Sequence, residues 1–492
     1  MSITTQNLQS QTASGVFWTF LEQLGRRGIV VLVTILLARF LTPDDFGLIA
    51  MVSVFFAFAN ALMDVGFRQA LIRKQNATQI DYATMFYSNL VLGFLAYGLL
   101  FFFAPAIASF YKEPRLILLV RIVGLVVLIN ALQFVQVVDL TRKLDFKTQF
   151  KVTIPAGIIS GLTAVLLAMG GAGVWSLVAQ MILSPLIITF SLWMISTWRP
   201  TFEFSISSFR ELFGFGSKLF LSGVLDILFR NIYVIVIAKL FNATLTGYFF
   251  FATKVRDIIL EQFSSSIQRV TFPALASVQD DDLQLKNGFR KVIQATTYLI
   301  FPAMVFLAVM ARPLFELLLN PKWLPAVLYL QLLCMEGLMY PLHAVNLNVL
   351  KVKGRSDLFL YLEIVKKIMI ACILLISSRY GIVPIIIGQS IFSVLAYMPN
   401  SYFSAKLIGY TAKEQMKDVS LSLLASVIAG TGAFLAGTTM EGFRSPGVTL
   451  VAQVPVACGV YVLASFILKI GIQVTLWMII KERIGRLIAK KA

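Results

Sequence analysis

Charged side chains interrupt several long apolar stretches of this chain, and they are the residues most able to do chemistry. Of its 492 residues, 58% are hydrophobic and only 13% are charged. A charge at the centre of a bilayer costs at least about 2.5–3.5 kcal/mol, so such groups are kept where they face protein or a water-filled cavity. By default they mark the path of a substrate or an ion. The pattern therefore predicts a transporter.

The cations in these stretches are the predicted binding groups for an anionic substrate. Arginine presents a planar fork of donors that matches the oxygens of a phosphate. The predicted substrate-binding residues, which would line one cationic cavity, are Arg26, Arg27, Arg230, Lys254, Arg256, Lys366 and Lys367. The predicted charge partners or ion-coupling groups are Glu22, Asp226, Asp257 and Glu261. The coupling ion would be H⁺ or Na⁺.

Each cluster also has a purely structural interpretation. Glu22 and Arg26 lie four residues apart, as do Asp226 and Arg230, so each pair can neutralise itself on one helix face. Residues 254, 257 and 261 can form a ladder of ion pairs along one helix. Long cationic side chains near the membrane surface, such as those at 366 and 367, can also extend to the interface. The sequence leaves these alternatives open.

The elements that would position these residues are membrane-spanning helices. Apolar runs of about 20 residues, enough to cross about 30 Å of hydrocarbon, recur with short breaks. We expect an all-α polytopic membrane protein with two pseudo-symmetric six-helix lobes and two extra C-terminal helices. The fourteen predicted spans are 14–40, 44–66, 81–104, 115–139, 150–170, 173–196, 212–240, 244–268, 289–311, 324–350, 357–378, 381–404, 417–438 and 447–470.

The distribution of basic residues predicts the orientation of these spans. The loops after the second, fourth, sixth, eighth, tenth and twelfth spans are richer in Lys and Arg than the loops between them. Cytoplasmic loops carry that excess, so both termini are expected in the cytoplasm and the protein in the inner membrane. The same rule accounts for a net charge of +18, and no nucleic-acid partner is expected.

An internal repeat supports the two-lobe arrangement. The segment ARFLTPDDFG at 38–47 aligns without a gap with AKLFNATLTG at 238–247. Thr42 and Asn242 are suited to cap the helices that follow, and Pro43 suits a first helical position. We expect an N-terminal lobe over 1–205, a C-terminal lobe over 206–410, two additional spans within 411–471 and a cytoplasmic amphipathic tail over 472–492. Such repeats are common in transporters, with the binding site between the halves.

Other chemistry has little support in the sequence. The three cysteines lie in apolar runs and the single histidine is His343, so neither a disulfide framework nor a metal site is expected. His343 shares a predicted span with Glu336, and a lone histidine there is more often a hydrogen-bonding residue than a proton relay. We expect no enzyme and no cofactor. The N-terminus lacks the basic start of a signal peptide, so the first apolar run should remain as a span.

The opening of the chain resembles a known family. Residues 14–74, SGVFWTFLEQLGRRGIVVLVTILLARFLTPDDFGLIAMVSVFFAFANALMDVGFRQALIRK, are similar to the start of Wzx-type polysaccharide flippases, especially the exopolysaccharide or colanic-acid exporter branch. These belong to the multidrug/oligosaccharidyl-lipid/polysaccharide (MOP) superfamily. The resemblance implies a V-shaped fold around a central cavity. It also implies that arginines of the first span and the extra helix pair contact the headgroup and lipid tail.

The resemblance further implies the substrate: an oligosaccharide repeat on undecaprenyl pyrophosphate, moved to the outer leaflet by alternating access. Partners would be membrane lipids and the polysaccharide polymerase and chain-length machinery. One alternative is a cation-coupled multidrug exporter of the same superfamily, expected to have twelve spans and an acidic cavity. Another is a membrane-embedded polysaccharide polymerase or ligase, which needs a large outer loop with catalytic residues.

Overall fold

The protein is built from long helices. The computed structural model describes residues 5–440 and 445–473, and every regular element within them is helical. The long helices are α1 Thr5–Phe40, α2 Pro43–Asp64, α4 Gln79–Tyr111, α5 Leu116–Arg142, α6 Phe146–Met169, α7 Val174–Ile195, α8 Ile206–Leu240, α9 Ala243–Ala276, α10 Asp282–Leu318, α11 Pro325–Val352, α12 Ser356–Ser377, α13 Ile382–Ile408, α14 Ala412–Met440 and α15 Pro446–Ile467. The short ones are α3 Phe67–Arg73, η1 Pro321–Trp323 and η2 Ser378–Tyr380. The long helices correspond one by one to the predicted spans. The predicted tail lies outside the described residues from 474 onward.

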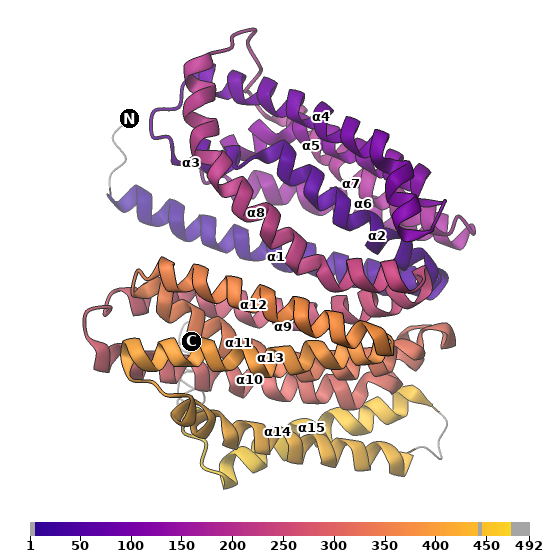
Figure 1. The fold of residues 1–492 in the computed structure, drawn as a ribbon, viewed down its shortest axis with the longest axis vertical. Coiled ribbons are helices and arrows are strands. Elements are labelled where there is room, and N and C mark those ends of the chain that lie inside the picture. Colours follow the sequence, from indigo (N-terminus) through magenta and orange to yellow (C-terminus); the bar gives the residue numbers. More distant parts are fainter. Residues whose placement is uncertain (1–4, 441–444, 474–492) are drawn as a thin grey trace, which may run out of the picture. The chain divides into compact units, whose positions relative to one another are not determined.

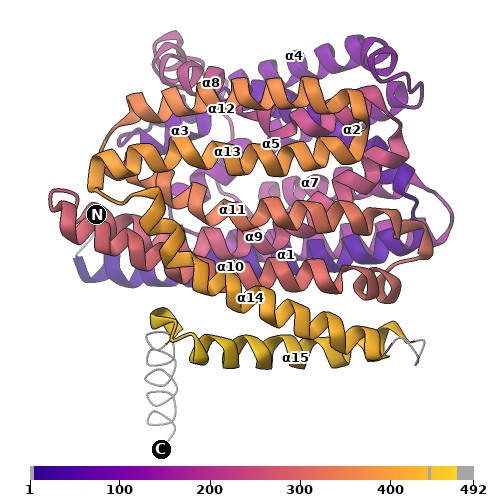
Figure 2. The same cartoon turned by 60° about the horizontal axis from the view of Figure 1, so that its bottom comes forward.

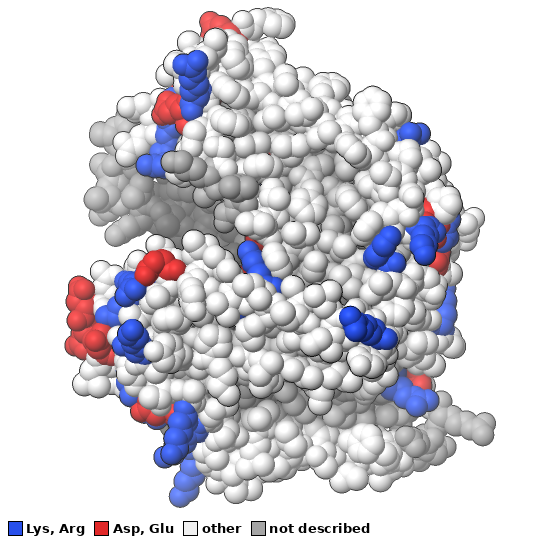
Figure 3. Space-filling view, viewed as in Figure 1, with Lys and Arg blue, Asp and Glu red and all other residues white. Residues whose placement is uncertain are grey.

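Ten stretches in the described part of the chain are long and apolar enough to cross a membrane. They comprise α2 with α3, and α4, α5, α6, α7, α10, α11, α13, α14 and α15. The other long helices, α1, α8, α9 and α12, are those that carry the predicted charge clusters. On the face shown in Figure 3, charged side chains gather mainly toward the helix ends, and a broad band is largely free of them. The prediction of an all-α polytopic membrane protein is confirmed.

Contacts divide the chain into two compact units, Met1–Phe250 and Phe251–Ala492. In the first unit, α5 packs on α4 and α7, α6 packs on α7 and α1, and α8 packs on α2, α3 and α4 (Figure 1). In the second unit, α11 packs on α10 and α13, and α12 packs on α13. The same pattern of neighbours therefore occurs in both units. The pairs α4–α5, α5–α7 and α6–α7 of the first unit correspond to α10–α11, α11–α13 and α12–α13 of the second. The domain boundaries expected at 205 and 410 stay predictions.

The last two helices form a layer of the second unit. Figure 2 shows α14 and α15 side by side, and both also pack on α10. Small residues allow the close approach: Ala425 and Ala429 on α14 are fully buried, in a cluster with Tyr461 and Ala464 of α15. The Tyr461 hydroxyl donates to the carbonyl of Tyr298 on α10 at 2.7 Å, which satisfies a polar group inside the bundle.

The helix starts predicted by the repeat are confirmed. Thr42 and Asp45 form a reciprocal capping box at the start of α2: the Thr42 hydroxyl accepts from the Asp45 N–H, and the Asp45 carboxylate accepts from the Thr42 N–H at 2.8 Å. Pro43 occupies the first turn. Before α9, the Asn242 side chain accepts from the N–H of Leu245 at 2.9 Å. Each copy of the repeat therefore ends one long helix and starts the next.

Candidate functional site

The two copies of the repeat touch each other inside the first unit, at two glycines. A Cβ atom on Gly47 would stand 1.8 Å from the carbonyl oxygen of Ala243, and one on Gly247 would stand 1.7 Å from that of Pro43. The second contact repeats the first with the two copies exchanged: position 247 corresponds to 47 (247 − 47 = 200), and position 243 corresponds to 43 (243 − 43 = 200). Such reciprocity is the mark of a two-fold symmetric contact, in which each partner offers the same patch. The starts of α2 and α9 therefore meet backbone to backbone.

A second pair of glycines brings the other end of α2 against α8. A Cβ atom on Gly216 would stand 2.2 Å from the carbonyl oxygen of Val65, and one on Gly66 would stand 2.8 Å from the carbonyl oxygen of Gly216. Gly66 also has a φ of 75°, in the left-handed region that favours glycine. The helix α2 is therefore held at both ends by contacts that leave no room for a side chain.

The predicted cations on α1 are placed differently from each other. Arg26 is exposed, and no carboxylate of the described residues lies within ion-pairing distance of its guanidinium. Glu22, one turn earlier, is half-buried and close enough to interact with Arg26 through its charge without forming an ion pair. Arg27 is half-buried. The helix α1 therefore offers a charged guanidinium that is open to an anionic ligand.

The predicted pair on α8 forms within its own helix. The Arg230 Nε atom donates to the Asp226 Oδ2 atom at 2.7 Å, and the two side chains are 77% and 55% exposed. A surface pair of this spacing contributes only about 0.3–0.5 kcal/mol. Asp226 thus satisfies part of the hydrogen-bonding capacity of Arg230 without fixing it in a protein core.

In the second unit, Arg256 on α9 lies in a buried cluster with two carboxylates. Its Nε and Nη2 atoms donate to Asp257 Oδ1 at 2.9 and 2.7 Å, and Nη1 donates to the Glu336 carboxylate on α11. The Arg256 side chain is only 9% exposed. Asp257 was among the charge partners predicted from the sequence, whereas Glu336 was not. A lone acidic residue in the apolar run 324–350 was the signal for it.

The remaining predicted residues also belong to the second unit. Lys254 is half-buried, and Glu261 is exposed. On α12, the Lys366 ammonium donates to the carboxylate of Glu363 one turn earlier, and the Lys366 side chain is 14% exposed. Lys367 is half-buried. Lys366 is therefore already held by a carboxylate of its own helix, as the structural interpretation of the sequence allowed.

His343 is hydrogen-bonded on both sides of its ring. Its Nε2 atom lies 3.1 Å from the Ser393 hydroxyl, and its Nδ1 atom lies 2.9 Å from the Asn400 side-chain nitrogen, both on α13. One turn along α11, the amides of Asn346 and Gln415 bond to each other at 2.9 and 3.0 Å. These contacts join α11 to α13 and α14, which fits a structural role for the histidine.

A polar pocket lies in the first unit at the end of α3. It encloses about 560 Å³ and is lined by residues that include Arg73, Lys74 and Glu211. The Lys74 ammonium donates to Glu211 at 2.7 Å and to Asp81 at 2.9 Å. Burial lowers the pKa of Lys74, but the hydrogen bonds to the two carboxylates outweigh it, so the pKa is raised above its ordinary value. Lys74 is thus a neutralised cation, unlike Arg26.

Within the described residues, no three His, Cys, Asp or Glu side chains are grouped so that they could hold a metal ion. The chemistry that this arrangement supports is charge pairing with an anion. Arg230 pairs with Asp226, and Arg256 pairs with both Asp257 and Glu336. Arg26 is exposed, with no carboxylate of the described residues within ion-pairing distance.

Comparisons with known proteins support a common family. The family model described as "Polysaccharide biosynthesis protein" matches residues 36–328. The teichuronic acid biosynthesis protein TuaB of Bacillus subtilis (strain 168) is 25% identical over 89% of this chain and 91% of its own length. The lipopolysaccharide biosynthesis protein WzxC of Escherichia coli (strain K12) is 25% identical over 80% of this chain and 81% of its own. The succinoglycan biosynthesis transport protein ExoT of Rhizobium meliloti (strain 1021) is 26% identical over 68% of each chain.

Two solved structures share the fold. The lipid II flippase MurJ in an inward closed conformation superimposes with a TM-score of 0.74 at 13% identity, covering 92% of this chain and 98% of its own. An inward-facing multidrug resistance MATE transporter of the MOP superfamily gives 0.60 at 15% identity, covering 78% of this chain and 96% of its own. Both are helical membrane transporters, and at such identities they inform on the fold alone.

Proposed function

The chain belongs to the family of polysaccharide biosynthesis proteins, and on that premise we propose that it carries lipid-linked oligosaccharide repeat units across the membrane. The substrate would bear a pyrophosphate between sugar and lipid, and would move from the cytoplasmic to the outer leaflet by alternating access. The relatives are named for the biosynthesis of surface polysaccharides, and ExoT is named a transport protein. A lipid carrier explains why such a transporter must handle charge and hydrocarbon together.

The observation that carries the proposal is the open guanidinium of Arg26 on a long helix. A pyrophosphate has about two negative charges, and moving it through hydrocarbon without a partner would cost many kcal/mol. A guanidinium with no carboxylate of the described residues in reach can replace part of the lost hydration with charge-assisted hydrogen bonds. Arg256 is already bound to two carboxylates, so it is a weaker candidate for the same task.

Coupling to an ion gradient belongs to the proposal as well, with H⁺ or Na⁺ as the ion. Among the four carboxylates predicted for this role, Asp226 is bound by Arg230 and Asp257 by Arg256. Glu22 is half-buried, lies on the same helix as Arg26 and forms no ion pair with a cation in the described part of the chain. It is therefore the carboxylate that a proton or a sodium ion would reach with least competition. Moving one charge through 100 mV supplies about 2.3 kcal/mol.

The fold argues against the two alternatives. A membrane-embedded polymerase or ligase needs a large loop for its catalytic residues, whereas the longest non-helical connection in the described chain is 196–205. A multidrug exporter was expected to have twelve spans and an acidic cavity. This chain has two further long helices, α14 and α15, and Arg26 on α1 has no carboxylate within ion-pairing distance among the residues that the structure describes.

The experiment is a flipping assay with fluorescent lipid-linked oligosaccharide in proteoliposomes. We expect Arg26→Ala combined with Arg27→Ala to slow flipping by about tenfold or more, because one charge-assisted hydrogen bond contributes about 1.5–3 kcal/mol. Arg26→Lys keeps the charge but loses the fork, and should retain part of the rate. Arg312→Ala is the matched control, since Arg312 is 75% exposed and pairs with Glu316 on its own helix.

An unchanged rate in the Arg26→Ala, Arg27→Ala variant would remove these residues from the mechanism. If the unmodified protein moves a cationic dye and not the oligosaccharide lipid, the multidrug alternative replaces the proposal. The orientation with both termini cytoplasmic is tested separately, by labelling of single cysteines placed in the loops at 144 and 171 from either side of the membrane.

A further inference from the structure

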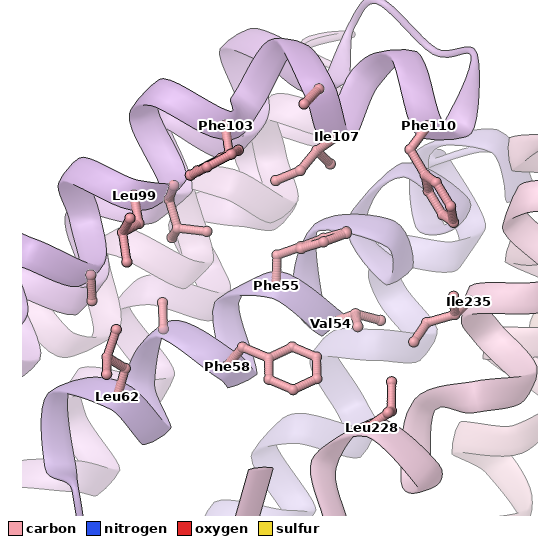
Figure 4. Close-up of a pocket in the computed structure, with 14 residues that line it drawn as sticks. Val54, Phe55, Phe58, Leu62, Leu99, Phe103, Ile107, Phe110, Leu228 and Ile235 are labelled. Atoms are coloured by element: carbon pink, nitrogen blue, oxygen red, sulfur yellow. The ribbon is translucent and has the colours of Figure 1, made fainter. Parts of the chain in front are cut away.

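An apolar groove runs along the first unit between α2, α4 and α8. It encloses about 620 Å³, within the range of about 300–1,000 Å³ that ligand sites occupy. Figure 4 shows the side chains of Phe55, Phe58, Phe103 and Phe110 around it. Leu228 and Ile235 line it on the α8 side. No lining residue is polar, so the groove suits a hydrocarbon ligand.

The groove is longer than one leaflet of a bilayer is thick. Its α4 wall extends from Ala96 to Phe110, which is about 21 Å at a rise of 1.5 Å per residue. Half of a bilayer's hydrocarbon core is about 15 Å thick. The groove therefore follows α4 through more than one leaflet and ends near Tyr111, at the end that the basic-residue rule assigns to the outer surface.

A lysine lies at that end of the groove. The Lys239 ammonium of α8 donates to the carbonyl oxygen of Phe110 at 2.6 Å and lies 4.4 Å from the centre of the Phe110 ring. Lys239 is exposed, and no carboxylate of the described residues lies within ion-pairing distance of it. An ammonium has three N–H donors, so two remain for another acceptor. The groove thus combines an apolar track with a positive charge at its outer end.

We propose that this groove binds the chain of a single-chain isoprenoid phosphate lipid, with its phosphate at Lys239. The apolar lining suits a hydrocarbon chain, and the single ammonium at its end suits one phosphate. It lies on α2, α4 and α8, and is therefore separate from the helix pair α14 and α15 of the second unit. The assignment of the chain as that of the lipid carrier rests on the proposed function. The groove would then hold the carrier with its phosphate at the outer surface and its chain running inward along α4.

The test is photo-crosslinking with the full chain in neutral phosphatidylcholine nanodiscs. A polyprenyl phosphate with a diazirine in its chain is one probe, and phosphatidylglycerol with a diazirine in one acyl chain is the other. We expect the polyprenyl probe to label peptides within 54–62 and 96–110. Excess unlabelled polyprenyl phosphate should remove the labelling, whereas excess phosphatidylglycerol should not.

Two variants examine the two parts of the site. Ala106 is exposed and lines the groove, so Ala106→Trp fills it without entering the core, and labelling should fall severalfold. Leu95→Trp is the matched control, because Leu95 is 52% exposed on the same helix and does not line the groove. Lys239→Gln should weaken competition by polyprenyl phosphate about tenfold, the effect of losing one charge-assisted contact.

Equal labelling by both probes, or loss of the polyprenyl label to excess phosphatidylglycerol, would show an ordinary lipid-facing surface and overturn the proposal. So would labelling that Ala106→Trp leaves unchanged. Crosslinking needs no transport, so the two proposals fail separately. Labelling without oligosaccharide flipping would contradict only the proposed function, and flipping without labelling would contradict only the groove.

Discussion

The two units hold the cations of their long helices in opposite ways. In the first unit, Arg26 is exposed on α1 with no carboxylate of the described residues in reach. In the second unit, Arg256 is buried between Asp257 and Glu336. Both were expected in one cationic cavity because both interrupt an apolar run. The difference shows that a charge in a long helix can stay exposed or can join two helices, and that the composition of its own helix does not distinguish the two.

The units also differ in how their helices are held together. In the first unit, glycines let α2 touch α8 and α9 through the backbone. In the second unit, ion pairs and amide pairs join α11 to α9, α13 and α14. Backbone contacts of this kind tolerate no added side chain, whereas polar contacts depend on both partners being present. The two modes of packing should therefore respond differently to substitution.

The largest effect is expected where one partner of the buried pair is removed. Glu336→Ala leaves the buried Arg256 with Asp257 as its one printed carboxylate partner and takes away the acceptor of its Nη1 atom, which should destabilise the second unit by about 3 kcal/mol, the low end for breaking a buried pair. The apparent melting temperature of the purified protein in detergent measures this. The combination of Arg256→Met and Glu336→Leu with Asp257→Asn should recover most of the loss, because all three charges of the cluster are then removed together. Equal losses in the single and combined variants would mean that the pair has no structural role.

The next effect tests the glycine contacts of the first unit. Gly47→Ala places a methyl group on the carbonyl of Ala243, which should cost about 1–3 kcal/mol or more because the backbone itself must move. Gly98→Ala is the control, since nothing lies within 4 Å of a Cβ atom at Gly98 in α4. It should stabilise the protein by about 0.4–1 kcal/mol. Thermal unfolding of both variants measures the change in stability, which should be a loss for Gly47→Ala and a gain for Gly98→Ala. A change of the same sign in both variants would contradict the close contact.

A transport measurement separates the two arginines more finely. Arg26→Ala should slow flipping by about tenfold, while its melting temperature stays that of the unmodified protein, because an exposed residue contributes within about 0.5 kcal/mol. Arg256→Ala should lower the melting temperature whatever it does to transport. If Arg26→Ala is less stable than Arg256→Ala, then Arg26 has a structural role and the contrast between α1 and α9 is wrong.

The smallest effect concerns the exposed pair on α8. Removing Asp226 and Arg230 together should change the free energy of unfolding by no more than about 0.5 kcal/mol, because the pair is exposed and lies within one helix. Melting curves at low and high salt provide the measurement, and the small difference should shrink further in high salt. A loss comparable to that of Glu336→Ala would place Arg230 in a structural cluster as well.

Much of the fold follows from the sequence because it depends on local signals. Helix length comes from the length of apolar runs, and the starts of α2 and α9 come from Thr42 and Asn242, which bond to residues within the next turn. The number of long helices and their order were predicted on this basis. The internal repeat was visible for the same reason, since equal local signals recur at equal spacing.

The partners of the charged side chains were decided by tertiary structure. Arg256 meets Glu336 across 80 positions of sequence, and Gly47 meets Ala243 across 196 (243 − 47). Helix periodicity specifies which residues share a face, but not which neighbouring helix that face meets. Sequence alone therefore identified the charges and their helices. Only the packing of the helices determined that Arg26 stays open to solvent and that Arg256 is enclosed by carboxylates.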